Sequence, residues 1–341
     1  MLSLDKVFDA QTVLKSIIRE TNVVKTYGIA PDCDLYLKPE NLQITGSFKV
    51  RGSAYKISQL SAEEKAKGVI ACSAGNHAQG VALAATKNGI KSLICLPDSA
   101  PISKVEATKG YGAEVCLVEG VYDDAYNKAI ELKEKEGYTF VHPFDDEGTI
   151  ALEVLNDLDN IDAIVVPVGG GGLISGIAYT AKHIRPSVKV YGVQMTGAPS
   201  MYNSIHDGKI ETLDTVQTVA DGIAVKRPGD NTFEIVKKYV DDIALVSEDE
   251  VSSAILALIE KQKMIAEGAG AVAVAAAMFN KIDIKGKKVI CLISGGNIEF
   301  RFVCAANWQA NGKGALTKPN GGTIRWGGAG TADSPRIQIV P

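Results

Sequence analysis

The stretch Asp162-Ala163-Ile164-Val165-Val166-Pro167-Val168-Gly169-Gly170-Gly171-Gly172-Leu173-Ile174-Ser175-Gly176-Ile177-Ala178 decides the fold. Its first part, Asp162–Val168, carries apolar residues on both faces, which predicts a strand covered by helices on both sides. The four glycines predict a tight turn, and the segment that begins at Leu173 predicts a helix. A strand, a turn and a helix in this order form the start of a βαβ unit.

Five further runs predict strands of the same kind, because each is short and rich in Val, Ile or Cys. These runs are Gly68–Cys72, Lys91–Leu96, Glu114–Val118, Val188–Gln194 and Lys287–Ile293. Amphipathic stretches such as Asp123–Lys135 and Glu248–Lys263 lie between them and predict helices. We therefore expect an α/β fold with two open, twisted, mostly parallel sheets flanked by helices.

The expected domains are nested. The chain has 341 residues and no Pro/Ser-rich linker, so a second domain is expected to be inserted and not appended. We predict a small domain at 68–142 inserted into a large domain made of 1–67 and 143–309. Residues 310–341 are rich in glycine with little apolar periodicity, which predicts an irregular tail.

The composition argues against several classes of protein. Charged residues make up 22% of the chain, the net charge is −4, and no basic stripe occurs, so we expect no nucleic-acid partner. No apolar stretch is long enough to cross a bilayer, and the N-terminus lacks the pattern of a secretion signal. We therefore expect a cytoplasmic protein that makes no contact with a membrane.

The cysteines predict buried free thiols in a reducing compartment. None of the six forms a C-x-x-C pair, and most lie inside apolar runs, so we expect neither disulfides nor a metal site. They are Cys33, Cys72, Cys95, Cys116, Cys291 and Cys304.

The glycine run Gly169–Gly172 predicts an anion site. A glycine turn before a helix lets several backbone N–H groups converge on one anion, and a phosphate is the expected guest. No Lys-Ser or Lys-Thr pair follows, which disfavours a nucleotide P-loop. Leu173 and Ile174 break the dinucleotide pattern, and the next predicted strand ends in Gln194 instead of an acid.

Three other motifs carry polar groups at predicted turns. In Thr45–Gly52, Gly46 and Ser47 predict a helix start with Lys49 in its first turn, where a lysine loses its proton more easily. Ser73–His77 and Ser294–Asn297 each follow a predicted strand directly. Taken alone, Lys49 has the pattern of a surface charge, and the other two have the pattern of a helix cap and a plain turn.

Together these segments resemble the fold-type II pyridoxal-phosphate enzymes, which have the tryptophan synthase β-like fold. The similarity is greatest to the threonine/serine dehydratase branch, and Lys38–Gly52 resembles its cofactor-lysine segment. The resemblance spans roughly Leu14 to Glu299. The motifs that follow in the family's order are Ser73–His77, Gly169–Gly172, Ala220–Val225, Glu267–Ala271 and Ser294–Asn297.

The resemblance implies pyridoxal 5'-phosphate as the cofactor. Lys49 would hold it through a Schiff base and later remove the substrate Cα proton. Asn76 would hydrogen-bond the ring hydroxyl, and Ser294 would face the pyridine nitrogen. Phe48 and Gly222 would lie beside the ring. Backbone N–H groups would hold the phosphate at Gly169, Gly170, Gly171, Gly172 and Leu173.

The implied reaction is the removal of water and ammonia from L-threonine, and from L-serine, giving 2-oxobutyrate or pyruvate. The loop with Ser73, Ala74, Gly75 and His77 would receive the substrate carboxylate. Because the Ser294 hydroxyl can leave the ring nitrogen unprotonated, the ring is a weak electron sink, which favours elimination over transamination. The resemblance also implies a homodimer or homotetramer.

Other functions remain open beside this one. A serine racemase of the same fold is one, although such racemases place a serine where Ala74 stands, and alanine cannot reprotonate the far face. A β-replacement enzyme, or a protein that binds the cofactor without turnover, are two more. A nucleotide-dependent reductase is disfavoured by the failed dinucleotide pattern.

The chain departs from the family in three places. Relatives carry several more residues, including a Gly-Gln pair, between His142–Asp146 and Gly148. Racemase-like relatives bind a divalent ion with an acid near Gln194, and the amide here disfavours that site. After Glu299 the similarity ends, so we expect no domain that senses amino acids.

Overall fold

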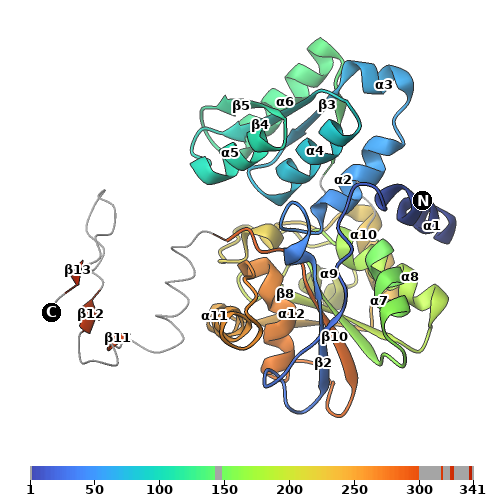
Figure 1. Ribbon diagram of the computed structural model, residues 1–341, viewed down its shortest axis with the longest axis vertical. Helices are drawn as coiled ribbons and strands as arrows, with labels where there is room; N and C mark the ends of the chain where they lie inside the picture. Colours follow the sequence, from blue (N-terminus) through green and yellow to red (C-terminus); the bar gives the residue numbers. More distant parts are fainter. Residues whose placement is uncertain (1, 143–147, 299–315, 318–322, 326–337, 340–341) are drawn as a thin grey trace.

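The computed structural model describes residues 2–142 and 148–298, and in the C-terminal part residues 316–317, 323–325 and 338–339. Two lobes, each built around its own sheet, lie one above the other in Figure 1. This arrangement confirms the predicted α/β class with two mostly parallel sheets flanked by helices.

The larger sheet has six strands in the order β1-β2-β10-β7-β8-β9. All neighbours pair in parallel except β1 with β2. The strands are β1 Val24–Lys25, β2 Asp34–Pro39, β7 Ala163–Pro167, β8 Lys189–Met195, β9 Asp242–Val246 and β10 Lys288–Ile293. The predicted strands at Asp162–Val168, Val188–Gln194 and Lys287–Ile293 are confirmed as β7, β8 and β10, whereas β1, β2 and β9 were not predicted.

Helices cover both faces of this sheet, which explains the doubly apolar strands. Val165 on β7 points into one core cluster, and its neighbours Ile164 and Val166 point into the other. The first cluster contains α11 Glu248–Ala257 and α12 Gly268–Met278, and the second contains α7 Thr149–Asp157, α8 Gly172–Ile184 and α10 Asp230–Tyr239. This lobe also contains α9 Ser200–Asp207, the short 3-10 helix η2 Asp221–Ile223 and the short π-helix η3 Leu258–Gln262.

The smaller sheet has four parallel strands in the order β5-β4-β3-β6. They are β3 Val69–Cys72, β4 Ser92–Pro97, β5 Glu114–Val118 and β6 Thr139–Phe140. The other elements of this part of the chain are α3 Ala62–Lys67, α4 Asn76–Lys87, α5 Ile102–Gly110 and α6 Tyr122–Glu136. Three of these strands and α6 were predicted, and the fourth strand is too short to carry a pattern.

Residues from α1 and α2 in the N-terminal part of the chain extend the core of the small lobe. Helix α1 spans Leu4–Leu14, η1 spans Glu40–Leu42, and α2 spans Lys49–Ser58. Leu14, Val50 and Ile57 share one cluster with Val69 of β3 and Val81 of α4. The predicted division at residue 68 stays a prediction, and this packing favours a boundary closer to the start of α2.

Two further predictions concern the shortened connection after His142 and the C-terminal tail. The shortened connection falls on residues 143–147, which lie outside the described residues. So does most of the predicted irregular tail, although β11 Leu316–Thr317, β12 Thr323–Arg325 and β13 Gln338–Ile339 form a small antiparallel sheet.

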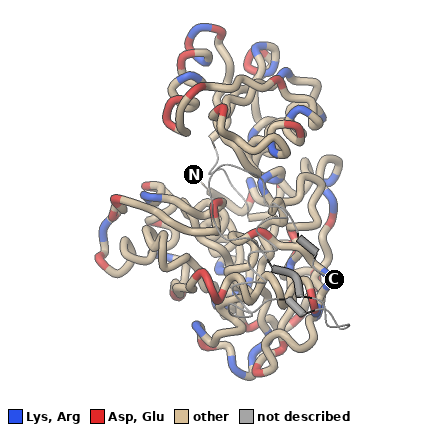
Figure 2. Tube along the Cα trace, turned by 90° about the vertical axis from the view of Figure 1, so that its left-hand side faces the viewer, with Lys and Arg blue, Asp and Glu red and all other residues tan. Residues whose placement is uncertain are grey.

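The surface of the described part carries charges of both signs. The positions of Lys and Arg and those of Asp and Glu are interspersed along the tube in Figure 2. The cysteines of that part, Cys33, Cys72, Cys95, Cys116 and Cys291, are free thiols. Within it, no helix has both the length and the apolar character needed to span a membrane.

Candidate active site

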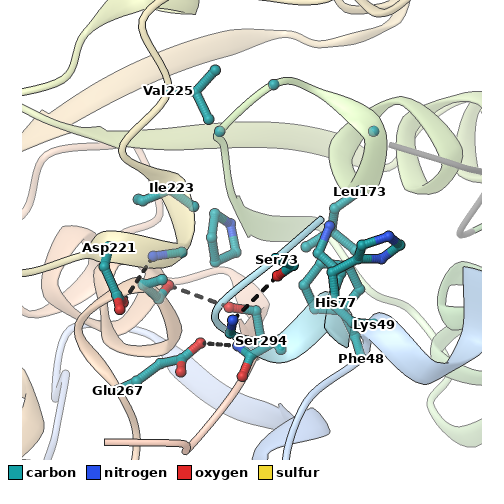
Figure 3. A pocket seen from close by; sticks show the side chains of 18 of the residues that line it. Phe48, Lys49, Ser73, His77, Leu173, Asp221, Ile223, Val225, Glu267 and Ser294 are labelled. Atoms are coloured by element: carbon teal, nitrogen blue, oxygen red, sulfur yellow. Dashed lines mark hydrogen bonds between the residues drawn. The ribbon is translucent and has the colours of Figure 1, made fainter. Parts of the chain in front are cut away.

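A cavity of about 360 Å³ lies where strands of both sheets end. Ser73 follows β3, Gly169 follows β7, and Ser294 follows β10, so the carboxyl ends of three strands meet at this cavity. Every residue that the sequence predicted for the site lines it. They are Phe48, Lys49, Ser73, Ala74, Gly75, Asn76, His77, Gly169, Gly170, Gly171, Gly172, Leu173, Gly222 and Ser294. Figure 3 shows how the labelled members of this set converge.

The glycine turn has a backbone that only glycine adopts easily. Gly171 has φ +98°, and a Cβ there would meet the Cε of Met201 at 2.7 Å. The Thr232 hydroxyl donates to the Gly170 carbonyl oxygen at 2.6 Å and holds the turn. Gly171 is the N-cap of α8, whose first N–H groups have no partners within the helix. Groups of this kind favour an anion, and here they lie at the edge of the cavity.

Lys49 is the first residue of α2, so its side chain leaves the first helical turn as predicted. Its Nζ lies 4.9 Å from the centre of the Phe48 ring. The Phe48 N–H donates to the carbonyl oxygen of Ser294 at 3.0 Å, and Ser47 forms an isolated bridge with Gly295. The backbone beside Lys49 is therefore fastened to the end of β10, which fixes the lysine next to Ser294.

Asn76, the first residue of α4, belongs to a chain of hydrogen bonds. Its Nδ2 donates to Glu267 Oε1 at 2.7 Å, and Asn297 Nδ2 donates to Asn76 Oδ1 at 2.8 Å. Asn297 also donates to the Thr45 carbonyl oxygen at 2.8 Å. The chain joins the small lobe to two segments of the large one and fixes the orientation of the Asn76 amide.

Glu267 is a functional candidate that the sequence reasoning missed. It lines the cavity and is buried, and burial together with the nearby Asp221 carboxylate raises its pKa to about 7. The motif Glu267–Ala271 is recognisable in the sequence. Its acid carries no predicted role, because a carboxylate at a helix start has an ordinary stabilising function there. Only the structure brings this group to the site.

His77 is buried, and its Nε2 lies 3.0 Å from the Val141 carbonyl oxygen. A carbonyl oxygen only accepts, so Nε2 carries the proton and Nδ1 is the unprotonated nitrogen. Burial, and next the positive charge of Lys49, lower the pKa of His77 to about 3. The imidazole is therefore neutral at physiological pH.

The loop between β3 and α4 presents polar groups to the cavity. Ser73 Oγ accepts from the Gly75 N–H at 3.2 Å, and Gly75 caps α4. A Cβ at Gly75 would meet no other atom within 4 Å, so the space beside this backbone is open. Ser294 Oγ donates to the Ala269 carbonyl oxygen at 3.3 Å, a long contact that leaves the hydroxyl able to turn. The loop and the hydroxyl thus face one space from two sides.

Two charged residues on the cavity wall were also missed. Lys104 of α5 and Asp221 of η2 form an ion pair of 3.0 Å between the small and the large lobe. Each has the pattern of an ordinary surface charge in the sequence, so no local signal marks it. The other unpredicted members of the wall are Tyr122, Pro167, Ile223, Val225 and Ala269.

The side chains that most often bind metals are those of His, Cys, Asp and Glu. Within the described part, no group of three or more His, Cys, Asp or Glu side chains is placed to hold a metal ion. Gln194, where racemase-like relatives place an acid near their ion, is fully buried and accepts from the Tyr202 N–H at 2.8 Å.

Comparison with known proteins assigns the family. Residues 14–295 match the family described as pyridoxal-phosphate dependent enzyme. The chain belongs to this family. Pyridoxal phosphate is accordingly its cofactor, and a lysine amine beside an anion site is the pair of groups that such a cofactor requires.

Three individual proteins show which members of the family the chain is similar to. The chain is 50% identical over 311 residues to the L-threonine ammonia-lyase of Thermotoga maritima, covering 89% of this chain and 77% of that protein. Its structure is similar to the processed form of threonine deaminase isoform 2 from Solanum lycopersicum, with TM-score 0.86, 36% identity and coverage of 90% and 88%. Maize serine racemase has TM-score 0.85 at 33% identity, covering 90% of this chain and 97% of the racemase.

Proposed function

We propose that this chain is a pyridoxal-phosphate-dependent threonine ammonia-lyase, which converts L-threonine into 2-oxobutyrate and ammonia. The observation that carries the proposal is the meeting of the Lys49 amine, the Gly169–Gly172 turn and the Ser294 hydroxyl in one cavity. The similarity to a threonine ammonia-lyase at 50% identity supports threonine as the substrate.

The chain's own groups fit the cofactor. The N–H groups from Gly169 to Leu173 are suited to its phosphate, because a Cβ at Gly171 would fill the turn and a helix N-terminus attracts anions. Lys49 would hold the cofactor covalently, and Asn76 would donate to its ring hydroxyl. Phe48 and Gly222 would lie beside the ring. When bound, the cofactor supplies an electron sink for the pair released at the substrate Cα.

The substrate carboxylate would lie against the β3–α4 loop. Ser73, Ala74 and Gly75 precede the N-terminus of α4, where free N–H groups and the helix dipole favour a negative charge. His77 is neutral, and its one ring N–H already donates to the Val141 carbonyl oxygen, so its ring adds neither a charge nor a donor there. His77 would instead contribute its backbone N–H, which lies in the first turn of α4. The Lys49 amine would then take the Cα proton as a general base.

Ser294 would determine which reaction follows. A hydroxyl can donate to a ring nitrogen without giving it a proton, unlike an aspartic acid at this position. Charge at Cα is then poorly stabilised, so the easier course is elimination, in which the Cα proton and the β-hydroxyl are lost together and the hydroxyl leaves, protonated, as water. Ser294 is able to act in this way because its contact with Ala269 is long.

The proposal is tested by cofactor binding and turnover in matched lysine variants. The holoenzyme is expected to show a visible absorption band and to release 2-oxobutyrate from L-threonine. Lys49→Ala is expected to lose both, whereas Lys56→Ala, an exposed lysine on the same helix, is expected to keep both. Full turnover in Lys49→Ala would overturn the proposal.

Four further properties complete the proposed function: a second substrate, an oligomeric state, a location in the cell and a domain movement. L-serine is expected to be a second substrate. It differs from L-threonine by one methyl group, which is worth only about 1–3 kcal/mol in an apolar pocket. We propose a homodimer or homotetramer in the cytoplasm, which size-exclusion chromatography with light scattering and cell fractionation test. The inserted small domain at 68–142 is proposed to move relative to the large one.

A further inference from the structure

Behind the lysine helix lies a buried cluster of charges that the proposed mechanism does not use. Arg51, two residues after Lys49 on α2, has no exposed surface. Its Nε and Nη2 donate to the two oxygens of Glu40, both at 2.8 Å. Its Nη1 and Nη2 donate to the two oxygens of Glu153 at 2.6 and 2.9 Å. One guanidinium therefore bridges two carboxylates, each through a pair of bonds.

Further groups complete the cluster. Lys38 is 1% exposed and donates to Glu153 Oε2 at 2.6 Å and to the Thr21 carbonyl oxygen. The Thr21 hydroxyl donates to Glu40 Oε1 at 2.5 Å. Two cations face two carboxylates, with Asp157 3.9 Å from Lys38 at the partly exposed edge. The Arg51 guanidinium offsets the burial of Glu40 and holds the pKa of that carboxyl below its usual range.

The cluster joins elements of different lobes. Helix α2 packs on α4 of the small lobe, and its Val50 and Ala54 lie in that lobe's core. Glu40 follows β2 of the large sheet, and Glu153 lies on α7, whose other side chains pack in the large core. Arg51 is therefore a point at which the lysine helix is fixed to the large lobe.

The position of Arg51 along the helix matters for Lys49. Residues two apart on an α-helix are separated by about 200° around its axis, so the two side chains leave opposite sides of α2. Lys49 lines the cavity, and Arg51 reaches away from it into the cluster. A rotation of α2 about its axis would carry the Lys49 amine along the cavity wall and would break the paired bonds of Arg51.

Stability alone does not explain the cluster. Replacing buried ion pairs by packed apolar residues is often neutral or stabilising, because desolvation opposes the attraction between the charges. Two paired contacts on a rigid guanidinium do, however, specify an orientation that apolar contacts leave free. The arrangement therefore defines the rotation about its own axis of the helix that carries the reactive amine.

We propose that Arg51, held by Glu40 and Glu153, is a positioning residue that fixes the rotation of α2 and so aims the Lys49 amine at the substrate Cα. Arg51 touches neither substrate nor cofactor and acts through Lys49. The proposal rests on the proposed function, since it requires Lys49 to be the reacting group.

The test compares variants of the cluster with a control of similar structural cost. Arg51→Lys keeps the charge, but one ammonium cannot make the two paired contacts. Glu153→Gln keeps a hydrogen-bonding group on a side chain that is 15% exposed, and removes one charge. Leu155→Ala removes a buried side chain from the same α7 core and touches none of the cluster's charges.

Holoenzymes are compared by the cofactor's visible band, its rate of attachment to the apoenzyme, kcat, KM and thermal unfolding. In Arg51→Lys and Glu153→Gln, kcat is expected to fall about tenfold or more, since a small misplacement of a reacting group is costly, while KM changes little. The band is expected to shift and attachment to slow. Leu155→Ala is expected to lose thermal stability but to keep the wild-type band, attachment rate and kcat.

The outcomes separate this proposal from the proposed function. A wild-type enzyme without threonine turnover would contradict the function itself. An active wild type, with Arg51→Lys and Glu153→Gln losing only stability as Leu155→Ala does, would overturn the positioning role. Should Arg51→Lys not fold, Glu153→Gln alone decides by the same readouts.

Discussion

Glu267 is a buried carboxyl group whose pKa is raised from the ordinary 4.5 to about 7, first by burial and then by the nearby Asp221 carboxylate. Between these two pH values the folded protein keeps a proton that the unfolded chain has lost. The contribution of this group to stability is therefore complete below about pH 4.5 and is lost as the pH rises towards 7. The Asn76 amide that donates to Glu267 opposes the shift without cancelling it.

Glu267→Gln is expected to remove this pH dependence. Across that window the wild-type free energy of unfolding should fall relative to the variant by about 1.4 kcal/mol per pH unit. Thermal unfolding of both holoenzymes at about pH 5 and about pH 7 measures it. An equal difference in stability between wild type and variant at the two pH values would show that the pKa of Glu267 is not raised.

Ala74 is the residue at which dehydration and racemisation should diverge. It lines the cavity and has no group able to deliver a proton. Ala74→Ser supplies a hydroxyl, and a positioned acid contributes about 10²–10⁴-fold to a proton transfer. We expect the variant to form D-serine from L-serine about 10²-fold faster than the wild type, as chiral chromatography measures. An unchanged, low D-serine yield would mean that residue 74 does not control this choice.

At the scale of single residues, the sequence predicted the groups that belong to ordered motifs. It did not predict Lys104, Asp221 or Glu267 as members of the site. Their roles depend on which lobe surface each one faces, and local spacing does not encode that. Arg51 was part of a recognised segment, yet its two carboxylate partners lie 11 and 102 positions away.

At the scale of elements, the glycine turn before α8 combines a left-handed backbone with crowding. Gly171 has φ +98°, and a Cβ would meet Met201 at 2.7 Å and Thr232 at 2.8 Å. Gly208, at the end of α9, has φ +70°, but a Cβ there would meet no other atom within 4 Å. Both glycines have a left-handed backbone, but only at Gly171 would an added Cβ also collide with neighbouring side chains.

Gly171→Ala is expected to weaken cofactor binding about tenfold or more, equivalent to about 1.4 kcal/mol. Gly208→Ala should cost a similar left-handed strain of about 1–2 kcal/mol and leave cofactor affinity unchanged. Titration of both apoenzymes with pyridoxal phosphate gives the comparison. Equal affinities of the two variants for pyridoxal phosphate would show that the turn does not bind the cofactor.

At the level of strands, apolar runs were easier to predict than a strand with a buried charge. Strands β7, β8 and β10 were predicted, because most of their residues are apolar and buried. Strand β2 contains Asp34 and Lys38, and Lys38 is buried only because Glu153 neutralises it. That compensation comes from a distant helix, so the pattern of β2 does not resemble a central strand. The edge strand β1 is two residues long and too short for any pattern.

At the scale of the molecule, the Lys104–Asp221 ion pair links the lobes at the cavity. Lys104 is 19% exposed and Asp221 66%, so such a pair is worth only about 0.2–1 kcal/mol. If the linked form binds substrate best, the apparent affinity falls with the population of that form.

Lys104→Gln and Asp221→Asn are each expected to raise KM for threonine about two- to fivefold with little change in kcat, and the effect should shrink at high salt. The exchanged double variant Lys104→Asp with Asp221→Lys is expected to recover most of the wild-type KM. Failure of the exchange to recover KM would indicate that Lys104 contacts the substrate itself.

The two-sheet architecture followed from the sequence, because alternating strands and helices leave few other arrangements. The division at residue 68 stays a prediction, and α2, which lies before it, packs in the core of the small lobe. Such a crossing depends on side-chain packing between segments and leaves no mark in composition.

The most direct test of the central claim is the product balance of the holoenzyme with L-threonine. We predict 2-oxobutyrate and ammonia in equal amounts, with threonine consumed to the same extent. A holoenzyme that carries the cofactor's visible band and forms no 2-oxobutyrate from L-threonine would contradict the claim.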